Sequence, residues 1–382
     1  MPPPRVSVII PSYNHEAFVG EAIESVLNQD FQDYELLIAD DHSSDHSVDV
    51  IKTYTDKRIR TFFLNENLGA TGILKFLIEH ARGEYIALLN SDDRWCPGKL
   101  SKQYAFLEKN QDYAACFTWA DFIDEHGNPI KKDSDLDLHM FIRENRTQYA
   151  WLNFFFYNGN CLCHPSILIR KSVYDTLGYY NGAYRQLPDF EYWIRLCVKY
   201  PIYIIEEVLV NHRRTTGENE NTSAVSTDNS KRSLSELVSI FSWLFTHVDD
   251  EVIIKAFQGN FIRRDAHTSA EIVCEKYFLM ANNPVFGSVI KNQACQYFMN
   301  HYLDDGVADC FKETYNYSQS DFYADNILSY AGYEKLFKQE GALRLLKPVC
   351  RFFRHILMVI YSKYIPDSIK KIYRKIKRLC AG

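Results

Sequence analysis

The sequence predicts an α/β fold: a mostly parallel sheet flanked by helices, with a helical C-terminal extension. Over the first hundred residues, short apolar runs alternate with segments that have helical spacing. Such alternation implies right-handed βαβ units and a parallel sheet. Polar residues follow three of the apolar runs, and the pattern from residue 233 to about residue 338 is mostly helical. A chain of 382 residues is long enough for one large domain with such an extension.

Four apolar runs define the predicted parallel strands, because buried parallel strands are short and almost wholly apolar. These runs are residues 6–10, 34–39, 60–64 and 85–89. The segments between them have helical spacing, which predicts helices at residues 16–29, 45–55 and 69–81. Further along we expect a helix after Lys99, strands at 114–119 and 165–171, and a helix at 188–200.

Polar side chains follow the first, second and fourth of these strands. They are Ser12, Tyr13 and Asn14, then Asp40 and Asp41, then Asp92 and Asp93. In open parallel sheets, ligands bind beyond the carboxyl ends of the strands. Because these ends lie at one edge of the sheet, the sequence predicts a single crevice that contains all three groups.

Asp92 and Asp93 follow an apolar strand, where a carboxylate pair is costly unless it faces water or binds a cation. Hard divalent cations commonly bind one or two carboxylates together with substrate phosphates. A cation there would neutralise a diphosphate leaving group. The alternative is a solvated turn, and the pair alone does not decide between the two.

Asp41 and Asp189 each allow a chemical and a structural interpretation. Asp41 could accept the N3–H of uracil while Tyr13 stacks on the ring. Asp189 could be a base that deprotonates a hydroxyl group during a group transfer. Each could instead cap the helix that follows it, and the sequence leaves both alternatives open.

The charge is distributed unevenly. The formal net charge is −6, but residues 341–382 contain eleven Lys or Arg and one Asp, a net charge of +10. The remainder is therefore acidic, at about −16, which argues against nucleic acid as its partner. The ten cysteines include no CxxC pair, so we interpret Cys161, Cys163 and His164 as buried residues rather than as a zinc site. With no secretory signal and no run of roughly 18 apolar residues, we expect a cytoplasmic protein.

Several motifs together resemble the family 2 glycosyltransferases with the GT-A fold, a Rossmann-like fold. In chain order they are Pro11-Ser12-Tyr13-Asn14, Asp40-Asp41-His42-Ser43-Ser44-Asp45, Gly83-Glu84-Tyr85-Ile86, Asn90-Ser91-Asp92-Asp93, His164-Pro165-Ser166 and Asp189-Phe190-Glu191-Tyr192-Trp193-Ile194-Arg195-Leu196. The first two are similar to the ends of that family's first and second strands. The last two are similar to its acceptor-side strand and catalytic-base helix. The resemblance covers roughly residues 5–215.

The resemblance implies an inverting, metal-dependent transferase that moves a sugar from a nucleotide-diphosphate sugar, with a UDP-sugar favoured. The acceptor would be a saccharide or lipid-linked saccharide in surface polysaccharide synthesis. Asp189 would be the general base, and Asp93 would bind Mn²⁺ or Mg²⁺, with His212 completing the metal site from a loop at residues 212–223. The residues implied at the donor are Pro11, Tyr13, Asp41, Lys75 and Asp92.

Two positions depart from the family's pattern. Asn90 stands where Asp is frequent, which leaves fewer charged ligands for a metal. Lys75 lies where the family often has an arginine near the diphosphate, so Lys75 or Arg94 would supply that positive charge. Arginines beside His212 could also meet the diphosphate, unless this segment is simply a polar loop.

The C-terminal tail has the pattern of a basic amphipathic helix. Over residues 368–380 the apolar side chains share one face: Ile369, Ile372, Tyr373, Ile376 and Leu379. Six Lys or Arg cover the rest, which suits an anionic membrane surface, where each cation contributes about 1 kcal/mol. The alternative is a helix packed on the acidic main body. We expect a GT-A domain at 1–228, a helical region at 229–342 and a membrane-associating tail at 343–382, at the inner face of the cell membrane.

Two other functions fit part of the pattern, and the oligomeric state stays open. A nucleotidyltransferase shares the general architecture, but it needs a Gly-rich loop near the first strand, which residues 11–20 lack. A catalytically inactive protein that binds nucleotide sugars or glycans would have no use for a base at Asp189.

Overall fold

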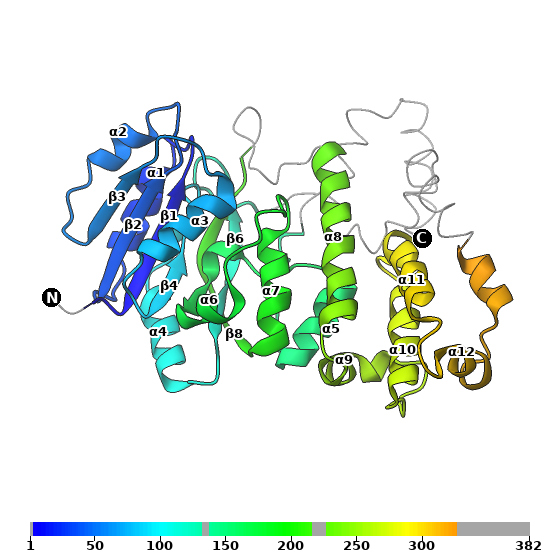
Figure 1. The fold of residues 1–382 in the computed structure, drawn as a ribbon. Coiled ribbons are helices and arrows are strands. Elements are labelled where there is room, and N and C mark those ends of the chain that lie inside the picture. The colour runs from blue at the N-terminus through cyan, green and yellow to red at the C-terminus, as the bar shows by residue number, and fades with distance from the viewer. Residues whose placement is uncertain (1–2, 132–136, 216–226, 327–382) are drawn as a thin grey trace. The chain divides into compact units, whose positions relative to one another are not determined.

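The computed structural model describes residues 3–131, 137–215 and 227–326. The chain divides into two compact units. Unit 1 comprises Met1–Lys132 and Leu138–Asn219, and unit 2 comprises Asp133–Asp137 and Glu220–Gly382. Unit 1 contains a mixed sheet flanked by helices, and the described part of unit 2 is helical (Figure 1). The predicted fold class is confirmed.

The described part of unit 1 forms an eight-stranded sheet in the order β3-β2-β1-β4-β7-β6-β8-β5. β1 pairs in parallel with β2 and β4, and β2 with β3, so the four strands predicted first form one parallel half. β6 and β8 are also parallel, whereas β7 and β5 run antiparallel to their neighbours. The strands are β1 Val6–Ser12, β2 Tyr34–Asp40, β3 Ile59–Phe63, β4 Tyr85–Leu88, β5 Arg94–Trp95, β6 Ala115–Ile123, β7 Leu168–Arg170 and β8 Ile202–Arg213.

Burial on both faces explains why the apolar runs form the parallel half. All residues of β2 and β4 are buried, as are those of β1 apart from Pro11. Helices cover the faces of the sheet and bury their own apolar sides; α1, for example, buries Val19, Ala22, Ile23 and Val26. The helices of unit 1 are α1 Val19–Leu27, α2 Ser47–Lys52, α3 Gly69–His80, α4 Lys99–Lys109, α5 Gln148–Asn158, α6 Ser172–Leu177 and α7 Pro188–Lys199.

The predicted strand at residues 165–171 is shorter than expected. Its first part is a 3-10 helix, η1 His164–Ser166, and β7 occupies only the three residues from Leu168 to Arg170. Pro165 has no N–H to donate to a strand ladder. The N–H and the hydroxyl of Ser166 both bond to the Cys163 carbonyl, at 3.0 and 2.7 Å, which holds the turn.

Unit 2 confirms the helical pattern as far as the structure describes it. Its first helix begins at Thr227. Within the described ranges, no helix has both the length and the apolar character that a membrane span requires. The predicted tail at 343–382 lies outside the described residues. The elements are α8 Thr227–His247, α9 Asp250–Phe257, η2 Gln258–Asn260, α10 Ser269–Ala281, α11 Gly287–His301, α12 Val307–Asp309 and the π-helix η3 Cys310–Thr314.

Candidate active site

The three polar strand ends are joined by hydrogen bonds across the edge of the sheet. β1 lies between β2 and β4, so its end is next to both of theirs. The Asp41 N–H donates to the Ser12 carbonyl at 2.8 Å, which links β2 to β1. On the other side, Nδ1 of His15 lies 2.7 Å from the hydroxyl of Ser91, which links β1 to the acidic motif after β4. The predicted convergence of these ends at one place is therefore present.

Asp41 is buried and interacts with the start of α3. Its carboxylate accepts the N–H groups of Leu68 and Gly69, at 2.7 and 3.0 Å. Burial raises the pKa of Asp41, although these two N–H groups oppose the shift. In the capping alternative, Asp41 would cap the next helix, α2. Its carboxylate instead accepts N–H groups at the start of α3. A carboxylate has about four acceptor positions, so two N–H bonds leave capacity for a ligand.

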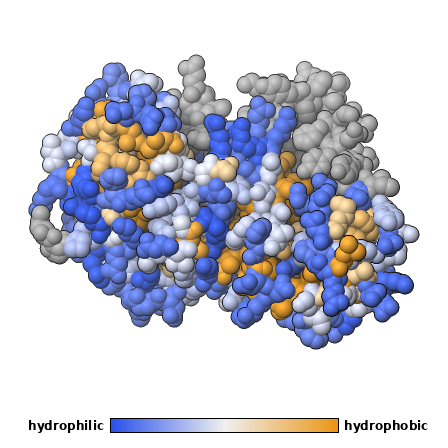
Figure 2. Space-filling model, viewed as in Figure 1, coloured by the Kyte–Doolittle hydropathy of each residue, from blue (hydrophilic) through white to orange (hydrophobic). Residues whose placement is uncertain are grey.

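Tyr13 lies at the carboxyl end of β1, two residues beyond Pro11, and is 48% exposed. Two more exposed apolar side chains lie at the same edge: Phe63, at the end of β3, and Leu68, just before α3. Figure 2 shows apolar surface over the part of unit 1 that contains β2 and β3. Exposed flat and apolar groups beside a buried acceptor suit a ring that carries both an apolar face and an N–H group.

Asp93 is completely buried and accepts three N–H groups. One oxygen faces Nδ1 of His212 at 3.0 Å and the Arg213 N–H at 2.7 Å, and the other accepts the Asn90 amide at 3.0 Å. Burial alone would raise the pKa of Asp93, but His212 and these donors together lower it. His212 belongs to β8 and pairs in register with Phe122, so the prediction that it lies in a loop was wrong.

Asp92 has a different environment from its neighbour. It is 7% exposed, and no other residue among those described donates a hydrogen bond to its carboxylate. Burial raises the pKa of Asp92 to about 6, and the charge of Asp93 adds to the increase. His15 and His212 partly oppose the shift. The pair therefore holds one firmly ionised carboxylate beside another whose charge is poorly compensated by the protein.

This arrangement fits a divalent cation whose ligands come partly from the protein and partly from a substrate. Among the described residues, no three His, Cys, Asp or Glu side chains already form a metal site. Mg²⁺ and similar hard cations commonly take one or two carboxylates and complete their shell with substrate phosphates and water. Asp92 and Asp93 offer that partial set, and the uncompensated charge of Asp92 favours a cation.

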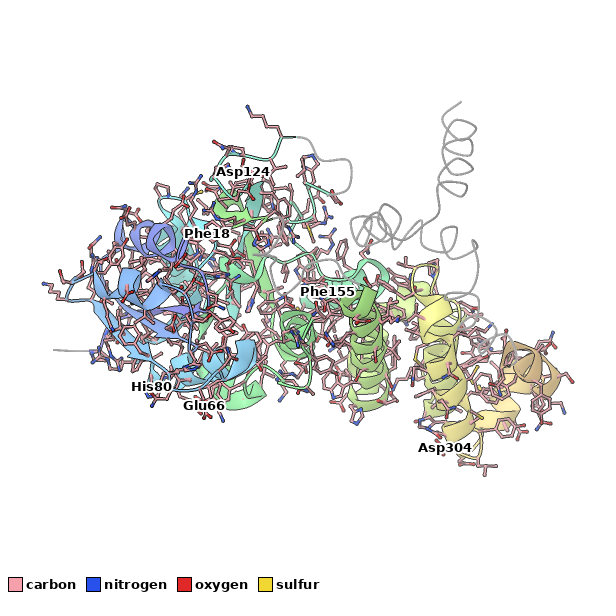
Figure 3. The ribbon with its side chains drawn as sticks, turned by 90° about the horizontal axis from the view of Figure 1, so that it is seen from above. Phe18, Glu66, His80, Asp124, Phe155 and Asp304 are labelled. Carbon is pink, nitrogen blue, oxygen red and sulfur yellow. The ribbon has the colours of Figure 1, made fainter. Side chains whose placement is uncertain are left out.

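Arg213 holds the acidic pair in place. Its guanidinium is buried, donates to the Asp92 carbonyl at 2.7 Å, and also binds the Glu21 carboxylate and the Asp124 carbonyl. It lies 4.8 Å from the centre of the Phe18 ring, and Figure 3 labels Phe18 and Asp124. The prediction that Arg213 meets a diphosphate was wrong, because its donors are used inside the protein. No sequence pattern pointed to Glu21, an ordinary acidic residue in α1.

The other two predicted cations, Lys75 and Arg94, differ in their partners. Lys75 is in α3, 3.8 Å from Glu79 and above the ring of Tyr179, and its side chain is 54% exposed. The Arg94 guanidinium has three partners: the Glu21 carboxylate, the Asn211 amide oxygen at 3.0 Å and the Gly127 carbonyl at 3.0 Å. Arg94 is thus held inside the protein, and Lys75 keeps an accessible ammonium group.

Asp189 lies in the first turn of α7, directly after Pro188. Its carboxylate accepts the Phe190 N–H at 2.7 Å and the Asn160 amide at 2.8 Å. Cys163 is buried, which raises its pKa, and the charges of Asp93 and Asp189 both act on it. Asn160 was not predicted from the sequence.

Comparison with known proteins agrees with this architecture. The family model "Glycosyl transferase family 2" matches residues 7–178. An uncharacterized glycosyltransferase of Methanocaldococcus jannaschii, MJ1057, is 32% identical over 224 residues, which cover 57% of this chain and 74% of that protein. The crystal structure of S. aureus TarS 1–349 with UDP-GlcNAc has a TM-score of 0.55 at 16% identity, covering 88% of this chain and 92% of that one. The TarS match concerns the fold alone.

Two further relatives have more specific names. The putative teichuronic acid biosynthesis glycosyltransferase TuaG of Bacillus subtilis is 38% identical over 34% of this chain and 52% of its own length. The UDP-Glc:alpha-D-GlcNAc-diphosphoundecaprenol beta-1,3-glucosyltransferase WfgD of Escherichia coli is 39% identical over 28% of this chain and 42% of its own. The match thus spans about half of each of these two proteins.

Acidic residues at the carboxyl edge of a GT-A-type sheet define the class of the glycosyltransferases. The chain belongs to glycosyltransferase family 2, and its relatives include enzymes of polysaccharide synthesis.

Proposed function

We propose that this chain transfers a sugar, with inversion, from a UDP-sugar to a hydroxyl group of a saccharide or lipid-linked saccharide in surface polysaccharide synthesis. The observation that carries the proposal is the separation of roles in the site. Asp41 and exposed Tyr13 lie at the ends of β2 and β1, the acidic pair follows β4, and Asp189 comes from α7. The UDP-GlcNAc bound by TarS and the UDP-Glc in the name of WfgD support the choice of donor.

The nucleotide binds at the end of β1. Tyr13 stacks on the uracil ring, Asp41 accepts its N3–H, and Pro11 supports this part of β1. Asp41 is preorganised for this role because the two N–H groups at the start of α3 fix its carboxylate. Asp92 lies toward the ribose or the metal. Lys75 supplies positive charge near the diphosphate, since Arg94 and Arg213 are held within the protein.

Asp93 and Asp92 would hold Mn²⁺ or Mg²⁺ together with the donor's diphosphate. His212, whose Nδ1 lies 3.0 Å from the Asp93 carboxylate, would complete the metal site. A bound cation supplies charge neutralisation for the departing nucleoside diphosphate. Asn90 and Arg213 keep the Asp93 carboxylate in position, so that its orientation does not depend on the ligand.

Asp189 is the general base. It takes the proton of the acceptor hydroxyl as the oxygen attacks the anomeric carbon. The new bond forms between that oxygen and the anomeric carbon, and the bond from the anomeric carbon to the diphosphate oxygen breaks with its electron pair. The products are the glycosylated acceptor, UDP and a protonated Asp189. A single displacement of this kind inverts the configuration at the anomeric carbon.

Replacing Asp189 by Asn tests the proposed chemistry. We expect Asp189→Asn to lower turnover by about 10²–10⁴-fold, the usual contribution of a general base. Donor affinity should change little, because Asp189 does not contact the nucleotide. Binding of UDP with Mn²⁺ and release of UDP from UDP-glucose or UDP-N-acetylglucosamine would measure the two effects separately. Turnover equal to that of the wild type would remove Asp189 from the mechanism.

The same experiment separates this proposal from the second candidate, a catalytically inactive protein that binds nucleotide sugars or glycans. Such a protein would bind UDP-sugars with a wild-type Asp189 and still release no UDP. The ordered carboxylate of Asp189, held by two N–H donors, favours the enzyme.

We also propose that the protein is cytoplasmic and attaches to the inner face of the cell membrane through residues 343–382. The net charge of +10 over residues 341–382 and the amphipathic pattern support attachment to anionic lipid. The helical region at 229–342 then lies between the GT-A domain, residues 1–228, and the tail. An enzyme at the membrane surface has access to an acceptor carried on a lipid.

A further inference from the structure

The Asp189 carboxylate is bonded to a residue that precedes it by 29 positions. Nδ2 of Asn160 donates to Oδ2 of Asp189 at 2.8 Å, while Oδ1 accepts the N–H of Phe190 at 2.7 Å. Each carboxylate oxygen thus accepts one of these two N–H groups. A hydrogen bond from a neutral donor stabilises the ionised form of a carboxylate, which is the form that a general base needs.

The position of Asn160 is set by the end of α5. Helix α5 ends at Asn158, and Gly159 follows with a φ of 79°, a left-handed conformation that favours glycine. The Gly159 N–H closes the helix on the Phe155 carbonyl at 2.9 Å. The sharp change of direction at Gly159 brings Asn160 beside the first turn of α7.

The side chain of Asn160 is also fixed in orientation. Its Oδ1 accepts the Leu162 N–H at 3.1 Å, so its NH₂ group is the one that faces Asp189. Helices α5 and α7 are themselves packed together, since Phe155 and Phe190 are fully buried and their rings meet edge-on at 5.6 Å. Figure 3 labels Phe155 on α5. The hydrogen bond between Asn160 and Asp189 therefore lies next to a packed contact between α5 and α7.

We propose that Asn160 is a positioning residue for the base: its amide directs the Asp189 carboxylate toward the acceptor hydroxyl. This inference rests on the proposed function of Asp189. Misplacement of a reacting group by about 1 Å can cost about 10²-fold in rate. Loss of the Asn160 amide should consequently slow the chemical step without weakening donor binding.

Asn160→Asp is the sharpest test, because it keeps the shape of the side chain and replaces a donor facing Asp189 by an acceptor. The probes are UDP-glucose and UDP-N-acetylglucosamine with Mn²⁺, and UDP release is measured with water as the acceptor. We expect kcat to fall by about 10–100-fold in Asn160→Asp and in Asn160→Ala, with KM for the donor within about twofold of wild type. Asn158→Ala is the matched control, since the Asn158 amide bonds to the Phe154 carbonyl at 2.9 Å instead.

The outcomes separate this inference from the proposed function. If Asp189→Asn is inactive while both Asn160 variants keep the wild-type kcat, Asn160 has no positioning role. If Asp189→Asn keeps its activity, the assignment of the base fails first. A loss of thermal stability in Asn160→Asp leaves Asn160→Ala to decide, because alanine removes the donor without adding a charge. An equal rise in KM and fall in kcat in that variant would indicate a general structural defect and would overturn the inference.

Discussion

The carboxylates of Asp92 and Asp93 are neighbours in sequence but differ in their cost to the fold. Asp93 is matched by the hydrogen bonds of His212, Arg213 and Asn90, and its pKa is lowered. Asp92 is buried beside that charge with a pKa of about 6. An ionised group whose pKa is raised by folding destabilises the folded state above that pKa. An ionised Asp92 thus lowers the stability of the fold but provides a negative charge for a bound cation.

Replacing Asp92 by Asn should therefore stabilise the protein without metal. The folded protein takes up a proton at Asp92 near pH 6, whereas an unfolded Asp does so near its ordinary value of 3.8. The wild type consequently loses stability as the pH rises through this range. We expect Asp92→Asn to gain about 1–3 kcal/mol of unfolding free energy above pH 6 and almost nothing below pH 4. Urea unfolding at pH 4 and pH 8 with EDTA would measure the difference.

The same variant should bind UDP and Mn²⁺ less tightly, since it loses a charged ligand. A variant that is less stable than wild type at pH 8, or that binds Mn²⁺ as well as wild type does, would contradict this account of Asp92.

The residue-scale roles were only partly predictable. The family resemblance assigned both Asp93 and His212 to the metal site. The different pKa shifts of Asp92 and Asp93 depend on burial and hydrogen bonding in the folded protein, which the sequence alone does not reveal.

At the scale of elements, the parallel half of the sheet was predictable, whereas the antiparallel strand β7 was predicted too long and β5 was not predicted. The runs that form β1, β2, β3 and β4 are apolar and regularly spaced, so local pattern is enough. β5 has two residues and β7 has three, and such short strands exist only because longer neighbours offer a partner. The hydrogen bond between Asn160 and Asp189 likewise depends on tertiary packing, because it forms only when α5 packs against α7.

Helix α1 is coupled to the acidic pair through Glu21, which binds both Arg94 and Arg213. Glu21→Gln should leave the buried Arg213 with a weaker partner. Glu21 is 38% exposed, so we expect a loss of about 1–2 kcal/mol rather than the larger cost of a fully buried pair. Mn²⁺ should also bind more weakly, because Arg213 holds the Asp92 carbonyl and the Asp93 carboxylate.

Thermal unfolding and Mn²⁺ titration in the presence of UDP would test both effects. Glu24→Gln is the control on the same helix, since the Glu24 carboxylate accepts a hydrogen bond from the Tyr54 hydroxyl at 3.2 Å. Equal Mn²⁺ affinity in the two variants would show that the coupling of α1 to the metal site is absent.

At the scale of the whole molecule, the tail and the rest of the chain have net charges of opposite sign. The acidic main body and the basic residues 341–382 favour a membrane surface for the tail alone. Removal of residues 343–382 should leave a soluble protein with unchanged UDP release, and it should move the protein from the membrane fraction to the soluble fraction. Unchanged fractionation of the truncated protein would contradict membrane attachment through this segment.

The central claim is that the crevice at Asp92 and Asp93 binds a nucleotide sugar through a metal. The most direct measurement is thermal stabilisation by UDP-glucose and UDP-N-acetylglucosamine, with Mn²⁺ and with EDTA, for the wild type and Asp93→Ala. A ligand at 100 times its Kd stabilises a protein by about 2.7 kcal/mol. We predict a shift of this order for at least one donor, only with Mn²⁺ and only in the wild type. Stabilisation that is equal in EDTA, or equal in Asp93→Ala, would contradict the claim.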